Sequence, residues 1–437
     1  MYNYDHREKF YQDDAIKEYL ILVPSDVEGE EPITITNDEI DDDTFEMFES
    51  IMDSDSFNLQ NCICSYVQFV TRNIIVPMLE KPIVVYEIID NDTENPIPIG
   101  MFIVKSDALS DDRRTREIVA YDLLFDIVNS DVTDWYHSLS FPITQKDFRD
   151  SFFSEFEIEQ DDSLLINDDI SFPDQLSDKD TLNGSSVVKC LAEINCVFPH
   201  IGKDGILHWI SLDIGDITRI ALFPSNTTFP GYSTFPGDGY KGTYTEITKE
   251  QYKEDTVVWQ NFATLPADAV QIRDDTNQVV YQTDEAVNPY IVINNFLCYN
   301  LSYGQLETIG NRLFKKISLI SYVPFRMTKM GDPCLEVGDR IFIHTQQAVK
   351  LATYVFSKHT KGTMVQFEDV EAKGTYQLGK FDGKVNSTAA KLKKLDNRVG
   401  NLEKSGSGPL QIISVAELPD NPQLNVLYLI QGTVRVE

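Results

Sequence analysis

The chain has few cysteines, and they are not arranged for metal binding or redox chemistry. Six occur among 437 residues, and no C-x-x-C pair is present. A zinc ribbon or a thioredoxin-type site needs such pairs, so neither kind of site is indicated. Cys62 and Cys64 have an i,i+2 spacing, which places both side chains on one face of a strand. We therefore expect buried free thiols, as suits assembly in a reducing cytoplasm.

Basic residues are also scarce. The chain has 37 Lys and Arg against 70 Asp and Glu, which gives a formal net charge of −33. Residues 13–55 hold sixteen acids and a single base, Lys17. Such a chain repels phosphate, so nucleic-acid binding is disfavoured. The plainer interpretation of the acids is a solvated surface. The sharper one is that some of them line a passage through which a polyanion slides without sticking.

Long apolar runs and catalytic motifs are missing as well. Residues 1–8 lack the apolar core of a signal peptide, and no run reaches membrane-spanning length, so we expect no membrane insertion by this chain. H-E-x-x-H, G-x-S-x-G and the P-loop do not occur, and the glycines of 223–243 predict a loop. We predict no catalytic, cofactor or metal site, although so many carboxylates leave a glycosidase-type pair open.

The apolar and aromatic residues that are present favour a β-rich fold with several helices. Alternating or apolar segments predict strands at 19–23, 33–36 and 317–323. The runs 82–89 and 97–104 flank a polar stretch and predict a hairpin. The spacing of Asp90, Asp92 and Glu94 in that stretch resembles a calcium loop. Asn95 and Met101 stand where the loop needs Gly and Glu, so we expect a solvated tip.

Helices are expected at five places, two of them with candidate caps. Their ranges are 6–18, 123–132, 144–156, a helix opening at Asn183, and 306–315. Thr144 is the candidate N-cap of the third, and Ser185 or Ser186 that of the fourth. The fourth leads into a second hairpin, whose turn is made by Asp204 and Gly205.

A heptad pattern near the C-terminus predicts a short coiled coil. Apolar residues and one threonine recur there at spacings of three and four, as at a and d positions. These are Val385, Thr388, Leu392, Leu395, Val399 and Leu402. We expect them to form an oligomer interface, with a flexible linker over 405–408 and a small β element after it. The plainer alternative is a helix that packs on its own chain. Three heptads are too few to hold an oligomer alone, so its main contacts are expected elsewhere.

The order of four N-terminal segments resembles one protein family. These segments are 33–40, 57–64, 97–104 and 117–124, and residues 186–209, 288–295 and 331–339 agree further along the chain. Each segment is loose, and the shared order carries the resemblance over residues 1–375. The chain resembles the N-terminal hub region of bacteriophage tail-tip proteins, which includes tail-associated lysins and prophage endopeptidase-tail proteins.

The resemblance implies an α+β fold that is mainly β, with two tube-type β-barrel hub domains around an α+β domain. The implied domains are a first barrel at 1–120, a helical middle domain at 121–212, a second barrel with an inserted β-rich segment at 213–375, a coiled-coil stem at 376–405, and a linker with a small β element at 406–437.

The resemblance also implies a virion component of the tail tip that is assembled in the host cytoplasm. Three copies would close the distal end of the tail tube in a ring and open for genome passage, without specific DNA binding. The implied partners are the distal tail protein, the tail tube, the tape measure protein, and tail fibres or receptor-binding proteins. Only about thirty residues follow the coil, so we expect no enzyme activity. The alternatives are a cell-wall- or glycan-degrading or -binding tail protein, and the equivalent hub of a contractile tail or phage-derived bacteriocin.

Overall fold

The structure is a computed structural model, and the chain divides into two compact units, Met1–Gln377 and Leu378–Glu437. In the first unit it describes residues 11–12, 15–24, 31–72, 76–93, 96–111, 113–173, 182–212, 245–284, 287–347, 349–363 and 366–375. In the second it describes two strands, 411–415 and 426–430.

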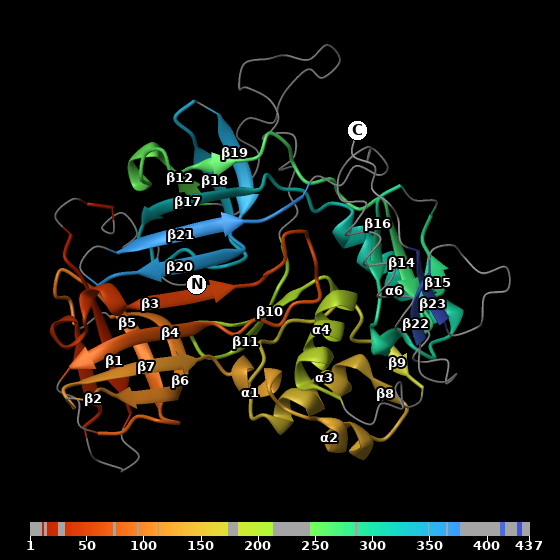
Figure 1. Cartoon of the computed structure of the whole chain (residues 1–437), viewed down its shortest axis with the longest axis horizontal. Coiled ribbons are helices and arrows are strands. Elements are labelled where there is room, and N and C mark those ends of the chain that lie inside the picture. The colour runs from red at the N-terminus through yellow and green to blue at the C-terminus, as the bar shows by residue number, and fades with distance from the viewer. Residues whose placement is uncertain are drawn as a thin grey trace. The chain divides into compact units, whose positions relative to one another are not determined.

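An antiparallel sheet of eleven strands is the framework of the first unit (Figure 1). Seven of its strands come from the N-terminal third of the chain and lie in the order β3-β4-β7-β6-β5-β1-β2. Side chains alternate between buried and half-exposed along β1 and β4, so one face of this sheet covers a core and the other faces outward. The seven are β1 (Lys17–Val23), β2 (Ile33–Thr36), β3 (Glu46–Ser50), β4 (Tyr66–Arg72), β5 (Pro82–Ile89), β6 (Ile97–Leu109) and β7 (Thr115–Tyr121).

These seven strands curl around an apolar core of their own. Beyond β2 the chain crosses back, and Ile40 forms an antiparallel bridge with Thr71 of β4. The rings of Tyr19 and Phe45 stack inside with their centroids 4.0 Å apart. The other members of this core are aliphatic or aromatic residues from all seven strands and their connections, and they form a cluster separate from the rest of the unit.

Four strands from the far end of the unit extend the same sheet. β20 (Ser357–Lys361) pairs with β3, and β21 (Phe367–Ala372), β17 (Phe325–Met330) and β13 (Val258–Trp259) follow in that order. Figure 1 shows the blue β20 beside the red β3, although Ser50 and Phe356 are 306 residues apart in the chain. The β3–β20 pairing therefore joins the two ends of the unit in one hydrogen-bonded sheet.

Helices and two short strand pairs connect these two parts. They are α1 (Leu124–Val128), α2 (Thr133–Ser138), α3 (Gln145–Glu155) and α4 (Gly184–Asn195), with the pairs β8 (Ile143–Thr144) and β9 (Ser171–Phe172), and β10 (Phe198–Ile201) and β11 (Leu207–Ile210). Trp135 packs edge-on against Phe148 and Phe152 to hold α2 on α3. The α1–α4 group lies together beside the sheet in Figure 1.

Two three-stranded sheets complete the first unit. One is β12 (Thr245–Ile247), β18 (Arg340–His344) and β19 (Lys350–Tyr354), and the other is β14 (Ala269–Arg273), β15 (Val279–Gln282) and β16 (Pro289–Val292). Helix α6 (Tyr303–Ile317) packs on the second sheet, where Gly310 leaves room for the ring of Tyr281. Single 3-10 turns occur at Asn37–Glu39, Asp42–Thr44, Lys249–Gln251 and Phe296–Cys298.

Most predicted elements are confirmed. The strands at 19–23 and 33–36 and both hairpins are present, and Gly205 supplies the positive φ of its turn, +78°. Thr144 caps α3 by accepting a hydrogen bond from the N–H of Asp147. The mainly β fold class with helices is confirmed, while the two-barrel layout and the domain boundaries stay predictions.

Three local predictions are wrong. Asn183, rather than Ser185 or Ser186, caps α4, because its amide oxygen accepts from the N–H of Ser185 at 2.8 Å. Residues 317–323 form no strand, since Ile317 ends α6, residues 318–319 form a turn, and of the others only residues 320–323 are buried. Residues 17–18 of the helix expected at 6–18 belong to β1.

In the second unit, β22 (Gln411–Val415) and β23 (Val426–Ile430) pair in parallel. A β element at 426–430 was expected there. All six predicted heptad residues, Val385, Thr388, Leu392, Leu395, Val399 and Leu402, lie outside the described residues.

Candidate functional site: the β3–β20 junction

The candidate site is the place where β3 meets β20, because both ends of the first unit join there. The two five-residue strands pair along their whole length, with Lys358 opposite Glu49 and His359 opposite Phe48. Since side chains alternate along a strand, Glu49 and Lys358 point to the buried side, and Phe48 and His359 to the outer side. The junction therefore has two faces with different chemistry.

Lys358 is at the centre of the buried face. Its Nζ lies 3.2 Å from Glu368 Oε1 and 3.8 Å from Glu49 Oε2. It also donates a hydrogen bond of 3.0 Å to the carbonyl oxygen of Leu335. Burial lowers the pKa of Lys358, but the carboxylates of Glu368 and Glu49 raise it by a larger amount. The pKa therefore lies above the ordinary lysine value. Lys358 is thus a fixed buried cation.

Glu368 connects Lys358 to a second buried lysine. Its Oε2 lies 3.0 Å from Lys329 Nζ, and both side chains are almost fully buried. Its Oε1 accepts from the backbone N–H of Asp332 at 3.0 Å, and Asp332 in turn accepts from the hydroxyl of Tyr11 at 2.7 Å. These carboxylates have both a cationic neighbour and hydrogen-bond donors, the condition under which buried charges are tolerated.

Two residues of the N-terminal strands complete this cluster. Lys17 donates to the carbonyl oxygen of Gly331 at 3.2 Å, and burial lowers its pKa. Burial raises the pKa of Glu87 to about 8, against the opposing effect of Lys17, so Glu87 holds its proton at pH 7. Three lysines then face three other carboxylates. We call this set the ion cluster: Lys17, Glu49, Glu87, Lys329, Asp332, Lys358 and Glu368.

The β10–β11 hairpin closes one side of the ion cluster. Lys203 from its turn lies 3.2 Å from Glu336 Oε1 and donates to the carbonyl oxygen of Pro333. His200 Nε2 lies 3.8 Å from Glu49 Oε1. Burial lowers the pKa of His200, so the ring is neutral at pH 7. The hairpin thereby fixes the loop that supplies carbonyl oxygens to the buried lysines.

Two other fully buried carboxyls lie outside the ion cluster. Burial raises the pKa of Asp122 to about 7, although backbone N–H groups of Ser65 and Leu124 donate to it. Burial likewise raises the pKa of Glu193 to about 7, against three hydrogen-bond donors from Gln60, Tyr290 and Asn295. Apart from Leu124, these donors come from distant segments, so both carboxyls hold connections together.

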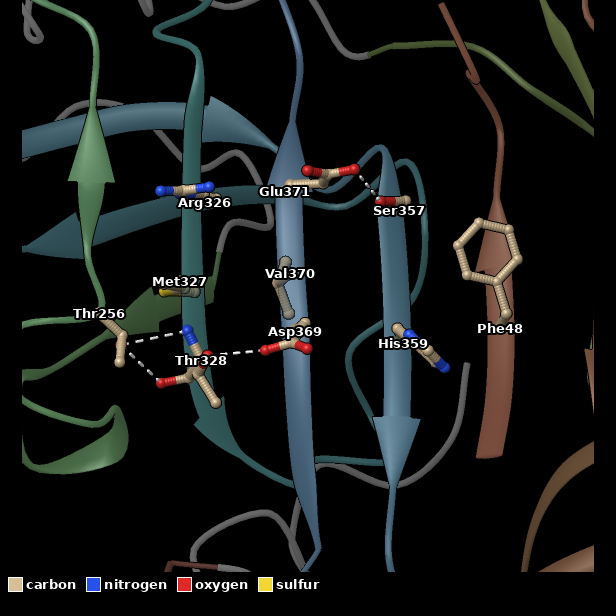
Figure 2. A pocket seen from close by; sticks show the side chains of 10 residues that line it. All are labelled: Phe48, Thr256, Arg326, Met327, Thr328, Ser357, His359, Asp369, Val370 and Glu371. Atoms are coloured by element: carbon tan, nitrogen blue, oxygen red, sulfur yellow. Dashed lines mark hydrogen bonds between the residues drawn. The ribbon is translucent and has the colours of Figure 1, made fainter. Parts of the chain in front are cut away.

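The outer face of the junction carries a shallow hollow of about 410 Å³ (Figure 2). It lies over β17, β21, β20 and β3 and is bordered by Thr256. Thr328 Oγ1 donates to Asp369 at 2.7 Å, and Ser357 Oγ donates to Glu371 at 3.2 Å. Its lining residues are Phe48, Thr256, Arg326, Met327, Thr328, Ser357, His359, Asp369, Val370 and Glu371. The hollow therefore has a mixed lining, in which polar and charged side chains alternate with Met327, Val370 and the phenyl ring of Phe48.

A row of half-buried rings continues from this hollow across the outer face. Strand pairing aligns one residue of each strand across the sheet, so that each lies directly opposite the next. In order these are Thr328, Asp369, His359, Phe48, Tyr66 and Tyr121. Adjacent ring centroids from His359 to Phe125 of α1 are 5.9, 5.6, 6.0 and 4.5 Å apart. We call these five residues the aromatic row: His359, Phe48, Tyr66, Tyr121 and Phe125.

No group of three or more His, Cys, Asp or Glu side chains is placed to hold a metal ion among the residues that the structure describes. None of the described helices is both long and apolar enough to cross a membrane. All six cysteines are free, as expected, and all but Cys64 are buried.

The acidic segment 13–55 is divided between the surface and the interior. Glu49 joins the ion cluster, while among the residues of this segment that the structure describes the exposed acids are Glu31, Asp38, Asp42, Asp43, Asp53 and Asp55. The solvated-surface interpretation therefore holds for these six.

The comparisons with known proteins gave structural matches only. Neither a protein-family model nor a curated protein matches the chain. It is similar to a tail protein from Neisseria meningitidis, with a TM-score of 0.45, 10% identity, and 82% of this chain and 96% of the other covered. A 43 kDa prophage tail protein from Shewanella oneidensis has a TM-score of 0.45 and 10% identity over 81% and 97%. A prophage tail protein from Listeria monocytogenes has a TM-score of 0.44 and 10% identity over 86% and 98%. All three are tail proteins, two of them from prophages.

Proposed function

We propose that this protein is a structural hub of a phage tail tip, and that three copies form a ring closing the distal end of the tail tube. The observation that carries the proposal is the β3–β20 pairing, which makes one stiff sheet from the two ends of the first unit. In this proposal the seven curled N-terminal strands form one barrel-type domain, and β12–β21 form the second. The order of the sequence segments over residues 1–375 supports the same assignment.

The open edges of the sheet support assembly into a ring. β2 and β13 are its outermost strands among the described residues, so each has an unpaired edge there. Exposed edges invite pairing with other chains, and closed rotational symmetry is the usual way in which such edges are used without forming fibres. A ring would have no free edge of this kind. The heptad residues Val385 to Leu402 would then form the axial stem.

In the proposed assembly the ring contacts the distal tail protein and tail tube on one side, and fibres or receptor-binding proteins on the other. It would open to let the tape measure protein and then the genome pass. A wall rich in carboxylates would repel DNA phosphates, so passage would need no release from basic side chains. The virion tail tip is the corresponding location.

Light scattering of the full chain tests the assembly. A stable mass of three times the 49.8 kDa of one chain is expected, and a ring should be visible by negative-stain electron microscopy. A chain that stays monomeric at tens of micromolar would contradict the hub assignment. Incubation with host peptidoglycan and polysaccharide provides the second readout, because released sugars or muropeptides would favour the glycan-degrading alternative.

Truncation at Gly383 tests the role of the stem. The heptads are too short to hold three chains alone, so the truncated protein should stay trimeric and lose only the stem and the terminal β element. If truncation yields monomers, the stem rather than the sheet holds the oligomer together. A full-length variant with Leu392 and Leu395 changed to Ser is the matched control, because it removes the seam and keeps the chain length.

A further inference from the structure

We propose that the β10–β11 hairpin covers a binding site for one buried water molecule, which bridges the side chains of Ser65, Glu49 and Asp122. These residues come from three separate segments, because Ser65 precedes β4, Glu49 lies in β3 and Asp122 follows β7. The inference does not depend on the tail function, since it follows from unpaired polar atoms and the size of one cavity. It makes water a structural ligand beside the β3–β20 junction.

The size of the cavity suits one water molecule. It measures about 10 Å³ and is lined by Ser65, Glu49 and Asp122, by residues 99–102 of β6, and by residues 201–203 of the hairpin. The three bridged residues are 3%, 5% and 3% exposed, so their side chains are shielded from bulk solvent. A cavity needs about 10–15 Å³ to hold one water, so this one has room for a single water and for nothing larger.

Two buried polar atoms of the lining residues lack a direct partner. Ser65 Oγ and Glu49 Oε2 make no hydrogen bond among the described residues. The pKa of Asp122 is raised by burial, and the nearby Ser65 hydroxyl opposes that effect, although the two groups lack the geometry of a hydrogen bond. Lys358 Nζ lies 3.8 Å from Glu49 Oε2, which is also beyond hydrogen-bond distance. Buried atoms of this kind are normally satisfied by ordered water.

The hydrogen-bonding groups match those of water. The Asp122 carboxyl accepts from the N–H groups of Ser65 at 2.7 Å and Leu124 at 3.0 Å, and each of its oxygens can accept a second bond. A water would donate to Asp122 and to Glu49 Oε2, and would accept from the hydroxyl of Ser65. These three bonds are the usual number for a buried water. The water thereby ties three segments together under the hairpin.

Charge and size exclude other ligands. The carboxyls of Glu49 and Asp122 disfavour an anion. A cation would lie among ammonium groups, because Lys203 lines the cavity and Lys358 faces the same oxygen of Glu49. A magnesium or calcium ion also needs about six oxygen ligands, whereas three side chains supply oxygens here. A neutral ligand with a single oxygen is what remains.

Ser65→Ala in the full-length protein should change the melting temperature in opposite directions with and without the water. A bridged hydroxyl contributes to stability, so its removal should lower the melting temperature by about 2 °C or more. An unpaired hydroxyl is a cost, so its removal would raise the melting temperature and overturn the proposal. Ser50→Ala is the matched control, since the buried Ser50 hydroxyl bonds directly to the carbonyl oxygens of Met52 and Phe356 at 3.0 and 3.2 Å. Its loss sets the scale for a fully bonded serine.

Oxygen-17 relaxation dispersion of water distinguishes a bridging water from a direct bond between Ser65 and Asp122. The method counts internal waters that exchange slowly with the solvent. Ser65→Val replaces the hydroxyl by one methyl group and adds a second that fills the cavity, so the count per chain should fall by one. An unchanged count in the folded variant would overturn the proposal. Ser50→Val is the control, because the Ser50 hydroxyl has direct carbonyl partners, and its count should stay the same.

A high-resolution crystal structure of the unaltered protein decides the question even if Ser65→Val does not fold. One isolated density peak is expected within about 2.6–3.2 Å of Ser65 Oγ, Glu49 Oε2 and an oxygen of Asp122. A peak with six oxygen ligands near 2.0–2.6 Å, the distances typical of magnesium and calcium, would assign the site to a cation and overturn the proposal. Ser65 Oγ bonded directly to a carboxylate, with no peak between them, would overturn it as well.

Discussion

Replacing Lys358 by Met should destabilise the first unit strongly, because it leaves buried carboxylates without their cation. Lys358 is 1% exposed, and its Nζ contacts Glu368 at 3.2 Å and Glu49 at 3.8 Å. Removing one partner of a buried ion pair costs about 3–5 kcal/mol. The carbonyl oxygen of Leu335 also loses its donor at 3.0 Å, which adds roughly 1 kcal/mol. We expect a total loss of about 4–6 kcal/mol.

Lys361 supplies the matched control on the same strand. It lies three residues away on the outer face, and its pair with Asp369 is about half exposed on both sides. Exposed pairs contribute about 0–1 kcal/mol, so Lys361→Met should be nearly neutral. The two variants remove the same charge and introduce the same side chain. The difference in their stability therefore measures the effect of burial.

Urea unfolding followed by circular dichroism, with hydrogen exchange of β3 and β20, is the assay. Lys358→Met should lower the unfolding midpoint and speed amide exchange in both strands, whereas Lys361→Met should do neither. Combining Lys358→Met with Glu49→Gln should recover part of the loss, because one unpaired carboxylate is removed. Similar small effects of Lys358→Met and Lys361→Met would refute the reasoning, since the ion cluster would then not hold the junction.

Three other predictions concern pH, packing and thiol reactivity. The three buried carboxyls with raised pKa keep protons in the folded state that the unfolded chain releases near pH 4, so stability should fall as the pH rises from about 4.5 to 8. Each carboxyl should contribute a loss of about 1.4 kcal/mol for every pH unit over which only its unfolded form is ionised, so urea unfolding should show a progressive loss between pH 5 and 8. Glu193→Gln should reduce that loss, and an equal loss in the variant would contradict the assignment. In α6, Gly304→Ala should stabilise the protein by about 0.5–1 kcal/mol, because a Cβ there meets open space. Gly310→Ala should destabilise it by about 1–3 kcal/mol, because a Cβ there clashes with the ring of Tyr281. Thermal melts that rank the two variants in the opposite order would count against this packing. Ellman's reagent should react slowly with the native protein at pH 8, with Cys64 first, and rapidly with all six thiols in urea; fast reaction of several thiols in the native state would contradict their burial.

Much of the fold could be predicted because it depends on local patterns. The alternation in Ile33–Thr36 and the two apolar runs of the β5–β6 hairpin are visible in any window of a few residues. The cap at Thr144 is local as well. The wrong strand at 317–323 has a physical reason, because Ile320, Tyr322 and Val323 are buried without joining a sheet. There the N–H of Tyr322 bonds to the hydroxyl of Thr264 instead.

The candidate site could not be predicted, because its contacts are distant in the chain and contrary to local pattern. In β17 the residues Phe325 and Met327 are buried, and Lys329 continues that phase into the core. A lysine at such a position is ordinarily expected to be exposed. Its partner Glu368 lies 39 residues further on. A charged residue in the buried phase of a strand is the one signal that could have indicated the ion cluster.

The distance in sequence between β3 and β20 has a consequence for synthesis. Ser50 leaves the ribosome 306 residues before Phe356, which at 5–20 residues per second is a delay of about 15–60 s. For that time β3 is an unpaired edge to which any other nascent chain could bind. Glu49, directed inward on that strand, is then a bare carboxylate of the kind that prevents edge-to-edge aggregation. The charge that later pairs with Lys358 would thus first protect the strand while it waits for its partner.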